Sequence, residues 1–204
     1  MDADKIQAKF GGDYLADDRT YILGIDRRFT VHLASRFMGR NVLETCTGAG
    51  FTTISLAKVA AHVWTVDIEP VHQKQAIENV KRAGCSERVS FIEGDVMSDV
   101  LGPATWEIDA AFLDPDWAVT GPSHVYRFIN SNTRPPADKL IKHVFEITNN
   151  VALVLPPFID LNETSSLPEH ECESLFLDNN HELYCLYFGE LCRIAGKTEY
   201  RAPV

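Results

Sequence analysis

Short apolar runs alternate with helix-like stretches between residues 41 and 155, and this alternation constrains the fold more than any other feature of the 204-residue chain. A strand that is followed by a helix returns to the same sheet in parallel with its neighbour. The pattern therefore predicts an α/β fold with a mostly parallel, doubly wound sheet. The expected strands are residues 42–46, 62–67, 88–93, 108–113 and 150–155, and the expected helices are residues 51–61, 70–83 and 137–148.

The end of the chain departs from this alternation. Residues 173–177 and 183–188 have strand character, and residues 178–181 between them include two asparagines. Such a short connection suits a hairpin and is too short for a helical crossover. We therefore expect an antiparallel C-terminal hairpin at the edge of the sheet. A parallel sheet with this addition is typical of the Rossmann-like class I fold of S-adenosylmethionine-dependent methyltransferases.

Composition and charge limit the partners of the chain. Lys and Arg number 19 against 29 Asp and Glu, a net charge of -10, which argues against sequence-blind binding to nucleic acid or an anionic membrane. Residues 151–192 hold eight acidic and no basic residues, so a local RNA-binding surface elsewhere is compatible with the charge. The oligomeric state stays open.

The sequence gives no indication of secretion, membrane insertion or metal binding. No apolar run approaches the roughly 20 residues that span a bilayer, and the N-terminus lacks the apolar core of a signal peptide. The five cysteines have no C-x-x-C spacing, and the histidines share no ligand spacing. We expect a cytoplasmic protein with reduced thiols, no membrane partner and no metal.

The turn after the first expected strand carries the strongest local motif, V-L-E-T-C-T-G-A-G over residues 42–50. Glycines at a strand-to-helix turn let a ligand approach the backbone, and the following helix N-terminus favours negative charge. A dinucleotide fingerprint requires a third small residue where Thr53 stands. Glu44, four residues before Gly48, instead supplies an acid that can hold a cationic amine, directly or through water. The turn therefore favours S-adenosylmethionine as the cofactor.

Two more acids end the next two strands. Asp67 follows Gly48 by 19 residues, the spacing of a carboxylate that accepts both ribose hydroxyls. Asp95 is placed to meet an adenine amino group, with Val96 packing on the ring. Each acid taken alone also has a structural interpretation: Glu44 as an acid at the entry to a helix, Asp67 as a cap at a strand end, and Asp95 as a helix N-cap. Together they end three successive strands, and we predict one cofactor site formed by Glu44, Cys46, Gly48, Gly50, Asp67, Ile68, Asp95 and Val96.

Asp114-Pro115-Asp116-Trp117 follows the fourth strand, where enzymes that methylate exocyclic amines of bases carry Asp/Asn/Ser-Pro-Pro-aromatic. An aromatic amine is a poor nucleophile, so oxygens that accept its hydrogens must orient its lone pair toward the methyl group. A ring stacked on the base adds about 1–3 kcal/mol. We predict Asp114, Pro115 and Trp117 as catalytic residues. The alternative is an Asp-Pro turn with Trp117 covering the core.

Residues 20–193 resemble the RNA cap guanine-N2 methyltransferase family, the trimethylguanosine synthases. Arg28-Phe29-Thr30-Val31 is similar to the family segment that closes over the cofactor, so residues 1–40 are expected to close over the site and residues 41–204 to form the methyltransferase domain. The resemblance implies S-adenosylmethionine and transfer to guanine N2. It rests on the Gly48 and Gly50 turn, residues 66–70, 91–95, 112–117, 147–150, 154–156, 176–180 and 187–191.

Two departures from the family pattern bear on the substrate. Asp116 replaces the second proline of the motif and places a negative charge near the expected base. Pro157 stands where the family carries an arginine that meets cap phosphates. Remaining candidates for phosphate contacts, which also fit an ordinary solvated face, are Arg27, Arg28, Arg127, Arg134, Lys139 and Lys142.

We therefore expect a methyltransferase that acts on an exocyclic amine of a base, guanine N2 in RNA, with RNA or a nucleotide as substrate. Two alternatives stay open. In a small-molecule methyltransferase, Asp116 would reflect a substrate other than nucleic acid. In a catalytically degenerate cofactor-binding partner protein, the altered motif would reflect lost activity.

Overall fold

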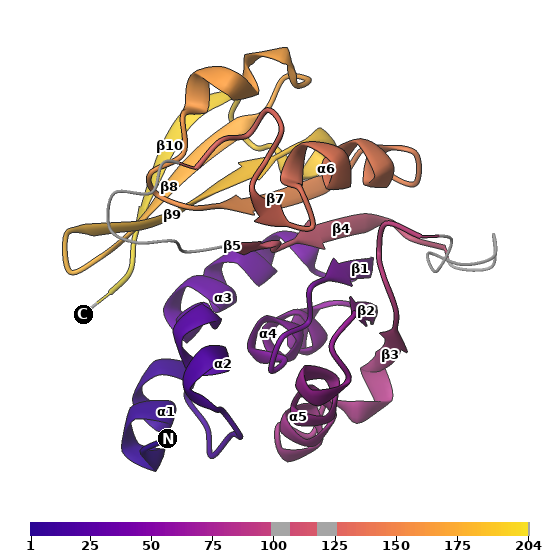
Figure 1. Ribbon diagram of the computed structural model, residues 1–204, viewed down its shortest axis with the longest axis vertical. Coiled ribbons are helices and arrows are strands. Elements are labelled where there is room, and N and C mark those ends of the chain that lie inside the picture. Colours follow the sequence, from indigo (N-terminus) through magenta and orange to yellow (C-terminus); the bar gives the residue numbers. More distant parts are fainter. Residues whose placement is uncertain (99–106, 118–125, 204) are drawn as a thin grey trace. The chain divides into compact units, whose positions relative to one another are not determined.

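The chain forms two compact units, Met1–Ala110 and Ala111–Val204 (Figure 1). The structure is a computed structural model that describes residues 1–98, 107–117 and 126–203. The first unit combines the N-terminal helices with the first three strands. That residues 1–40 close over a ligand site stays a prediction.

Three parallel strands form the sheet of the first unit: β1 (Asn41–Thr45), β2 (His62–Asp67) and β3 (Val89–Glu93). The connecting helices α4 (Phe51–Val59) and α5 (Pro70–Arg82) pack beside β2, and α5 also packs beside β3. A short 3-10 helix, η2 (Ser86–Arg88), leads into β3. In the parallel register Thr45 faces Val66 and Asp67 faces Glu93, so all three strands end at one edge.

The predicted strands and helices of this unit lie within two residues of those observed. β1 ends at Thr45 because Cys46 adopts a left-handed backbone conformation, with φ 64°. Gly84, with φ 70°, follows α5 in the left-handed conformation that commonly ends a helix. Pro70 begins α5, where its missing N–H leaves no hydrogen bond unmade.

The N-terminal segment is helical: α1 (Ala3–Phe10), α2 (Asp18–Leu23), α3 (Arg27–Ala34) and η1 (Ser35–Phe37). An aspartate precedes each α-helix, and its side chain accepts a hydrogen bond from a backbone N–H of the first turn. α3 packs on α4, where the Thr30 and Ser55 hydroxyls lie 2.7 Å apart in the core.

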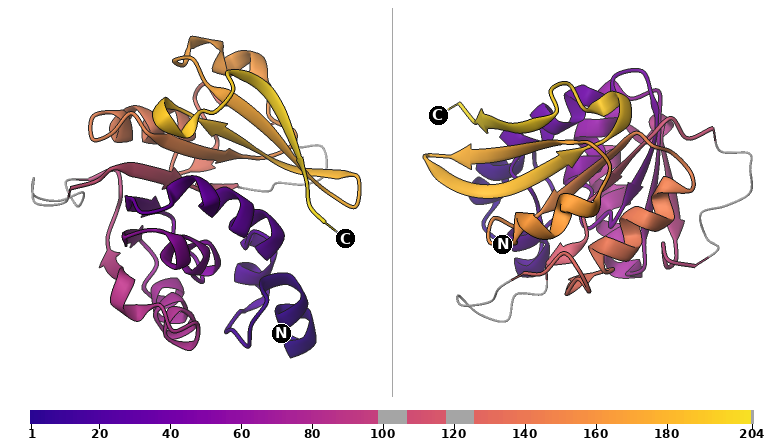
Figure 2. Two further views of the ribbon diagram at one scale, coloured as in Figure 1. Left: turned by 180° about the vertical axis from the view of Figure 1, so that it is seen from behind. Right: turned by 90° about the horizontal axis from the view of Figure 1, so that it is seen from above.

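The second unit contains the rest of the expected strands. β4 (Ala110–Leu113) runs parallel to β7 (Val151–Leu155), with α6 (Ala137–Phe145) between them in sequence. β8 (Glu171–Leu177) and β9 (Asn180–Tyr187) form the expected antiparallel hairpin (Figure 2). The connection is two residues long: Asp178 and Asn179 both have positive φ, as a type I′ turn requires. The mostly parallel sheet with an antiparallel C-terminal hairpin is confirmed.

The sequence predicted that the hairpin forms the edge of the sheet, and this prediction is wrong. A further strand, β10 (Gly196–Arg201), lies outside it in parallel with β8, and the strand order here is β10-β8-β9-β7-β4. β10 has alternating charged residues and only intermediate or exposed positions, so it lacks the apolar run by which a strand is recognised. The other short elements are β5 (Asp116–Trp117), β6 (Thr133–Arg134), η4 (Leu161–Ser166) and η5 (Gly189–Leu191).

Candidate active site

The turn between β1 and α4 has the geometry of a ligand-binding loop. Gly48 and Gly50 have φ of 53° and 81°, values that favour glycine. A Cβ at Gly50 would lie 3.1 Å from Cα of Ala76 in α5, whereas a Cβ at Gly48 would meet no atom within 4 Å. Gly50 is therefore required for helix packing, and the space beside Gly48 is open to a ligand.

Asp67 is tied directly to this turn. Gly48 N–H donates to one carboxylate oxygen at 2.8 Å, and Glu69 N–H donates to the other at 2.8 Å. A carboxylate has about four acceptor positions, so two remain for the hydroxyls of a ribose. Ile68 next to it is 62% exposed and offers apolar surface beside the same strand end. The structure thus brings together three of the predicted cofactor residues.

Glu44 lies inside the unit. Its side chain is 2% exposed and accepts a hydrogen bond from the Thr53 hydroxyl at 2.6 Å. Burial raises the pKa of Glu44 to about 7, partly offset by hydrogen bonds from Thr53 and Thr65. Thr53, which departs from the dinucleotide fingerprint, is therefore the partner of this acid. A bound cation would favour the ionised form, and the contact of Glu44 with the cofactor amine stays a prediction.

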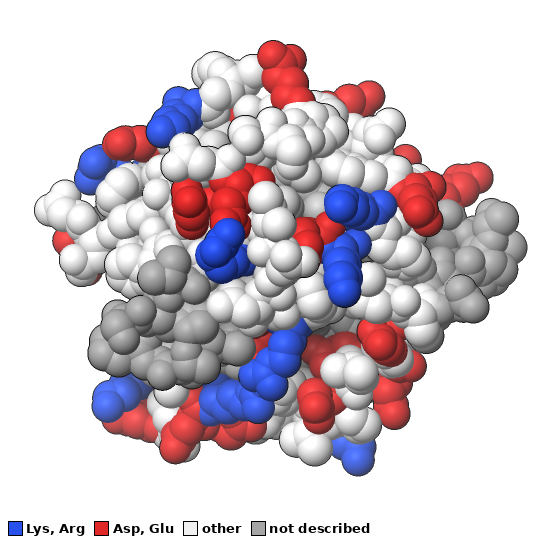
Figure 3. Space-filling model, turned by 45° about the horizontal axis from the view of Figure 1, so that its top comes forward, with Lys and Arg blue, Asp and Glu red and all other residues white. Residues whose placement is uncertain are grey.

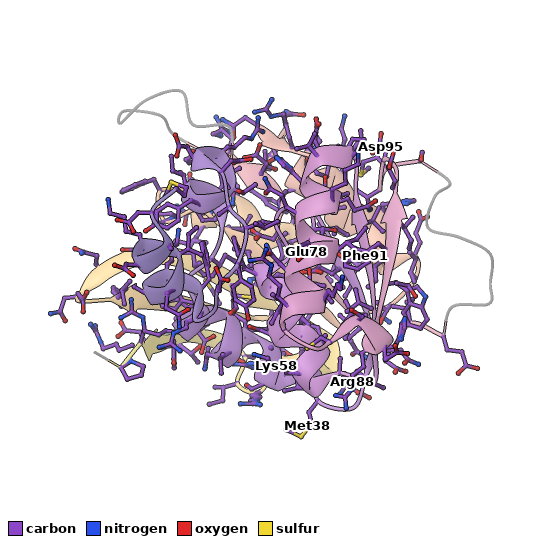
Figure 4. The ribbon with its side chains drawn as sticks, turned by 90° about the horizontal axis from the view of Figure 1, so that it is seen from below. Met38, Lys58, Glu78, Arg88, Phe91 and Asp95 are labelled. Atoms are coloured by element: carbon purple, nitrogen blue, oxygen red, sulfur yellow. The ribbon has the colours of Figure 1, made fainter. Side chains whose placement is uncertain are left out.

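Asp95 and Val96 follow β3 at the same edge. Gly94 N–H donates to the Asp67 carbonyl at 2.9 Å, which joins the ends of β2 and β3. Figure 4 shows Asp95 beyond the carboxyl end of β3 and Arg88 at the opposite end. The exposed Asp95 side chain accepts from Met97 N–H at 2.9 Å, while Val96 is buried. Asp95 therefore shapes a turn and keeps acceptor capacity for a ligand.

These groups fit S-adenosylmethionine. Asp67 offers acceptors for a ribose diol, and Ile68 offers apolar surface for an adenine ring. The N-terminus of α4 is capped by Gly50 without a side-chain hydrogen bond, so its backbone amides can meet a carboxylate. The donors and acceptors at this edge therefore match the ends of the cofactor.

Residues that the sequence reasoning missed support the turn from the N-terminal side. Ile6 and Phe10 of α1 form one buried cluster with Ala49 and Phe51. The fully buried Asn79 of α5 donates to the carbonyls of Ala49 at 2.9 Å and Leu15 at 2.8 Å, and it accepts from Leu15 N–H at 2.6 Å. No local sequence pattern distinguishes an Asn with this role from any other Asn within a helix.

In the second unit, the Asp114-Pro115-Asp116-Trp117 motif follows β4 directly. Asp116 and Trp117 pair with Arg134 and Thr133 in the β5–β6 ribbon. Side chains alternate between the two faces of a strand, so Asp116 and Trp117 point to opposite faces. The Arg134 guanidinium lies 3.7 Å from the Asp116 carboxylate. The negative charge expected near the base therefore has a cationic partner and faces away from Trp117.

The side chains of the motif are partly buried. Asp114 and Trp117 are of intermediate exposure, and Pro115 is buried. The indole Nε1 of Trp117 is buried and has no hydrogen-bond partner within the described ranges of the chain. Trp117 is therefore buried along its pyrrole edge, and part of its surface remains accessible.

Two carboxylates hold the loop that precedes β6. Glu163 of η4 accepts from the backbone N–H groups of Phe128 and Ile129 at 2.8 and 2.9 Å, and it pairs with Arg127. Asp138 of α6 accepts from Asn130 and Ser131 N–H at 3.1 and 3.3 Å. Neither acid was predicted, because each lies far in sequence from the motif that it supports.

Three of the six predicted phosphate contacts pair with acidic side chains of the protein. Arg28 pairs with Asp26 at 2.9 Å, Arg127 with Glu163 and Arg134 with Asp116. Lys139 and Lys142 are exposed on α6, and the Arg27 side chain lies against Gly11. In Figure 3, Lys and Arg stand singly or in small groups among Asp and Glu. The visible face carries no extended basic surface.

Within residues 1–98, 107–117 and 126–203, no helix is both long enough and apolar enough to cross a membrane. No group of three or more His, Cys, Asp or Glu side chains there is placed to hold a metal ion.

Solved structures share this fold. The chain superposes on a structure from Porphyromonas gingivalis W83 described as a methyltransferase, with a TM-score of 0.76, 17% identity and coverage of 91% of this chain and 47% of that one. Cofactor-bound Rv0187 from MTB has a TM-score of 0.56 and 18% identity, covering 85% and 81%. TrmK of M. capricolum, in complex with S-adenosyl-homocysteine, has a TM-score of 0.54 and 10% identity, covering 85% and 70%. The fold is that of Rossmann-like class I methyltransferases.

Sequence comparisons give relatives and a family. A catechol O-methyltransferase of Mycobacterium tuberculosis is 35% identical over 92 residues, 44% of this chain and 42% of that protein. One from Niastella koreensis is 28% identical over 95 residues, 44% and 43%. The chain therefore aligns with less than half the length of these curated relatives. The family model described as RNA cap guanine-N2 methyltransferase matches residues 39–190, and the chain belongs to this family.

Proposed function

We propose that this protein transfers a methyl group from S-adenosylmethionine to the exocyclic N2 of guanine in RNA. The observation that carries the proposal is the family match over residues 39–190, which includes both the Gly48 turn and the Asp114-Pro115-Asp116-Trp117 motif. The geometry of the two units supports it. Asp67 is held beside Gly48 in the first, and Trp117 is held in the β5–β6 ribbon of the second.

Methyl transfer to an exocyclic amine depends more on the positioning of that amine than on a strong base. S-adenosylmethionine, held by Asp67 and the Gly48 turn, would supply an electrophilic methyl group: the amine nitrogen would take the methyl carbon, sulfur would keep the electron pair of the broken bond, and the amine would release a proton to solvent. Asp114 accepts an amine hydrogen and so directs the nitrogen lone pair. Pro115 limits the backbone that carries this acceptor, and Trp117 stacks on the base.

A small-molecule substrate is the second candidate, and one observation favours it. The curated relatives named above are catechol O-methyltransferases, one of them 35% identical over 92 residues. A catechol hydroxyl needs deprotonation, whereas an amine needs orientation, so the two substrates require different groups beside the methyl carbon. The acceptor Asp114 and the aromatic Trp117 favour the amine.

The test is methyl transfer from tritiated S-adenosylmethionine to total RNA, guanosine and catechol, with the product nucleoside identified by chromatography. We expect N2-methylguanosine from RNA or guanosine. Asp114→Ala is expected to reduce the rate about 100-fold or more, whereas Lys197→Ala, on the exposed strand β10, is expected to match the wild type. Methylated catechol with unlabelled RNA and guanosine would refute the proposal in favour of the small-molecule alternative.

A further inference from the structure

An exposed aromatic ring stands at the edge of the sheet that carries the methylation motif. β4 and β7 are parallel neighbours, and Leu113 faces Leu153 in their register. Parallel strands end at the same edge, so Asp114 and the segment that begins at Pro156, two residues further along its strand, leave the sheet at one edge. That segment reads Pro156-Pro157-Phe158-Ile159, and Phe158 is 72% exposed.

The backbone around Phe158 is fixed. Pro156 and Pro157 restrict φ, and Ile159 N–H donates to the Pro156 carbonyl at 3.3 Å. Ile159 also forms a β-bridge with Tyr126. Burial raises the pKa of the Tyr126 phenol, and the nearby charge of Asp116 raises it further. The ring is therefore presented from a rigid segment linked to the motif, and a ligand that stacks on it loses little protein entropy.

The charges of this unit do not favour binding through phosphates. Arg127 and Arg134, the guanidinium groups of the loop that contacts Ile159, pair with Glu163 and Asp116. Residues 111–204 hold seven Lys and Arg against 13 Asp and Glu. A polyanion therefore meets a net negative unit in which two guanidinium groups are already paired and Lys139 and Lys142 of α6 are exposed, so we expect ring contacts to contribute most of its affinity.

We infer that Phe158 is a substrate-binding residue that stacks on a nucleobase, and that the substrate is held by its ring rather than by its phosphates. This inference rests on the proposed function for the kind of ligand. It narrows the substrate class to a nucleoside, or a base at an accessible position of RNA, whose recognition does not depend on a phosphate chain.

The test is equilibrium binding of guanosine and guanosine 5′-monophosphate in the presence of S-adenosylhomocysteine, so that no turnover occurs. We expect Phe158→Ala to weaken the binding of both ligands about 5- to 150-fold, the range of one lost base stack. Phe158→Trp should retain binding. Ile194→Ala is the matched control, because Ile194 is 66% exposed in the same unit on the loop before β10, and it should leave affinity unchanged.

Salt dependence supplies an independent readout. We expect the two ligands to bind within threefold of each other, and the affinity of the monophosphate to change little with salt concentration, since no ion pair with its phosphate is needed. Equal affinity of Phe158→Ala and wild type, or binding of the monophosphate alone with a steep salt slope, would overturn the inference. The proposed methyl transfer is judged separately, by the wild-type product.

Discussion

At the scale of single residues, the cofactor side of the molecule depends on where carboxylates find their partners. Asp67 has backbone N–H donors on both oxygens, whereas Glu44 is buried and accepts from the Thr53 hydroxyl. Burial without a cation disfavours the charged form of a carboxylate and raises the pKa of Glu44. The two acids of the first unit are therefore suited to different tasks, a fixed acceptor and a group whose charge depends on its ligand.

The burial of Glu44 predicts a pH-dependent stability. Its pKa is about 7 in the folded chain against an ordinary 4.5, so the folded state holds a proton that the unfolded state has already released between these values. The contribution of protonated Glu44 to the free energy of unfolding is full below about pH 4.5. It is lost as the pH rises to 7, which lowers the free energy of unfolding by up to roughly 3 kcal/mol. Urea unfolding at pH 5 and pH 7.5 measures it.

The control for this prediction is Glu44→Gln, which keeps the size of the side chain and removes its titration. The free energy of unfolding of this variant should fall less between the two pH values than that of the wild type. Equal pH profiles would show that Glu44 does not hold a proton in the folded protein.

At the scale of elements, the N-terminal helices and the cofactor turn share their supports. Phe10 of α1 stacks on Phe51, the first residue of α4, with ring centroids 3.5 Å apart. Asn79 of α5 bonds both Leu15 in the N-terminal segment and Ala49 in the turn. The closing of residues 1–40 over the site stays a prediction. The buried Asn79 side-chain amide supports it physically, because this amide bonds both to the N-terminal segment and to the turn.

Asn79→Ala is expected to loosen the N-terminal segment. It leaves the Leu15 and Ala49 carbonyls without this donor, and the free energy of unfolding should fall by roughly 1–3 kcal/mol. Hydrogen exchange of residues 3–23 should accelerate, while exchange in α6 of the second unit should change less.

Gln75→Ala is the matched control in the same helix, because the Gln75 side chain hydrogen-bonds to Thr20 and Asp17, at 3.2 and 3.0 Å, near the surface. Its effect on exchange should be smaller than that of Asn79→Ala. Unchanged exchange of residues 3–23 in Asn79→Ala would contradict the proposed support.

At the scale of the whole molecule, the chain divides its candidate site residues between two units. The predicted cofactor residues all belong to Met1–Ala110, and the predicted catalytic residues all belong to Ala111–Val204. β4 begins at the last residue of the first unit and leads straight to Asp114. Cofactor binding and base binding are therefore expected to respond to different substitutions.

This division predicts two separable losses. Asp67→Asn should weaken S-adenosylhomocysteine about 10- to 150-fold, since it removes charged acceptors of the ribose, and should leave the fold of the second unit intact. Trp117→Ala should abolish methyl transfer with little effect on S-adenosylhomocysteine. Calorimetry measures the affinity for S-adenosylhomocysteine, and the tritium assay measures the rate of methyl transfer. A large loss of cofactor affinity in Trp117→Ala would contradict the division.

Most of the fold could be predicted because its strands are buried and its turns carry glycine, proline or asparagine. β7 is an apolar run between Asn150 and Pro156, β1 is a buried strand that ends just before the Gly48 turn, and the hairpin turn needs positive φ at Asp178 and Asn179. β10 escaped prediction because an exposed edge strand has no apolar face to recognise. The β5–β6 ribbon escaped it because two-residue strands are defined only by their partners.

The sequence by itself determined the α/β order, the glycine turn, the acids at three strand ends and the motif after β4, because these depend on spacing along the chain. Only the tertiary structure decided that Thr53 is the partner of Glu44, that Arg134 pairs with Asp116, and that Asn79 contacts Leu15 and Ala49. It likewise decided that Phe158, just after β7, lies exposed at the sheet edge where β4 also ends. Contacts between distant segments follow from packing, which no local pattern of residues specifies.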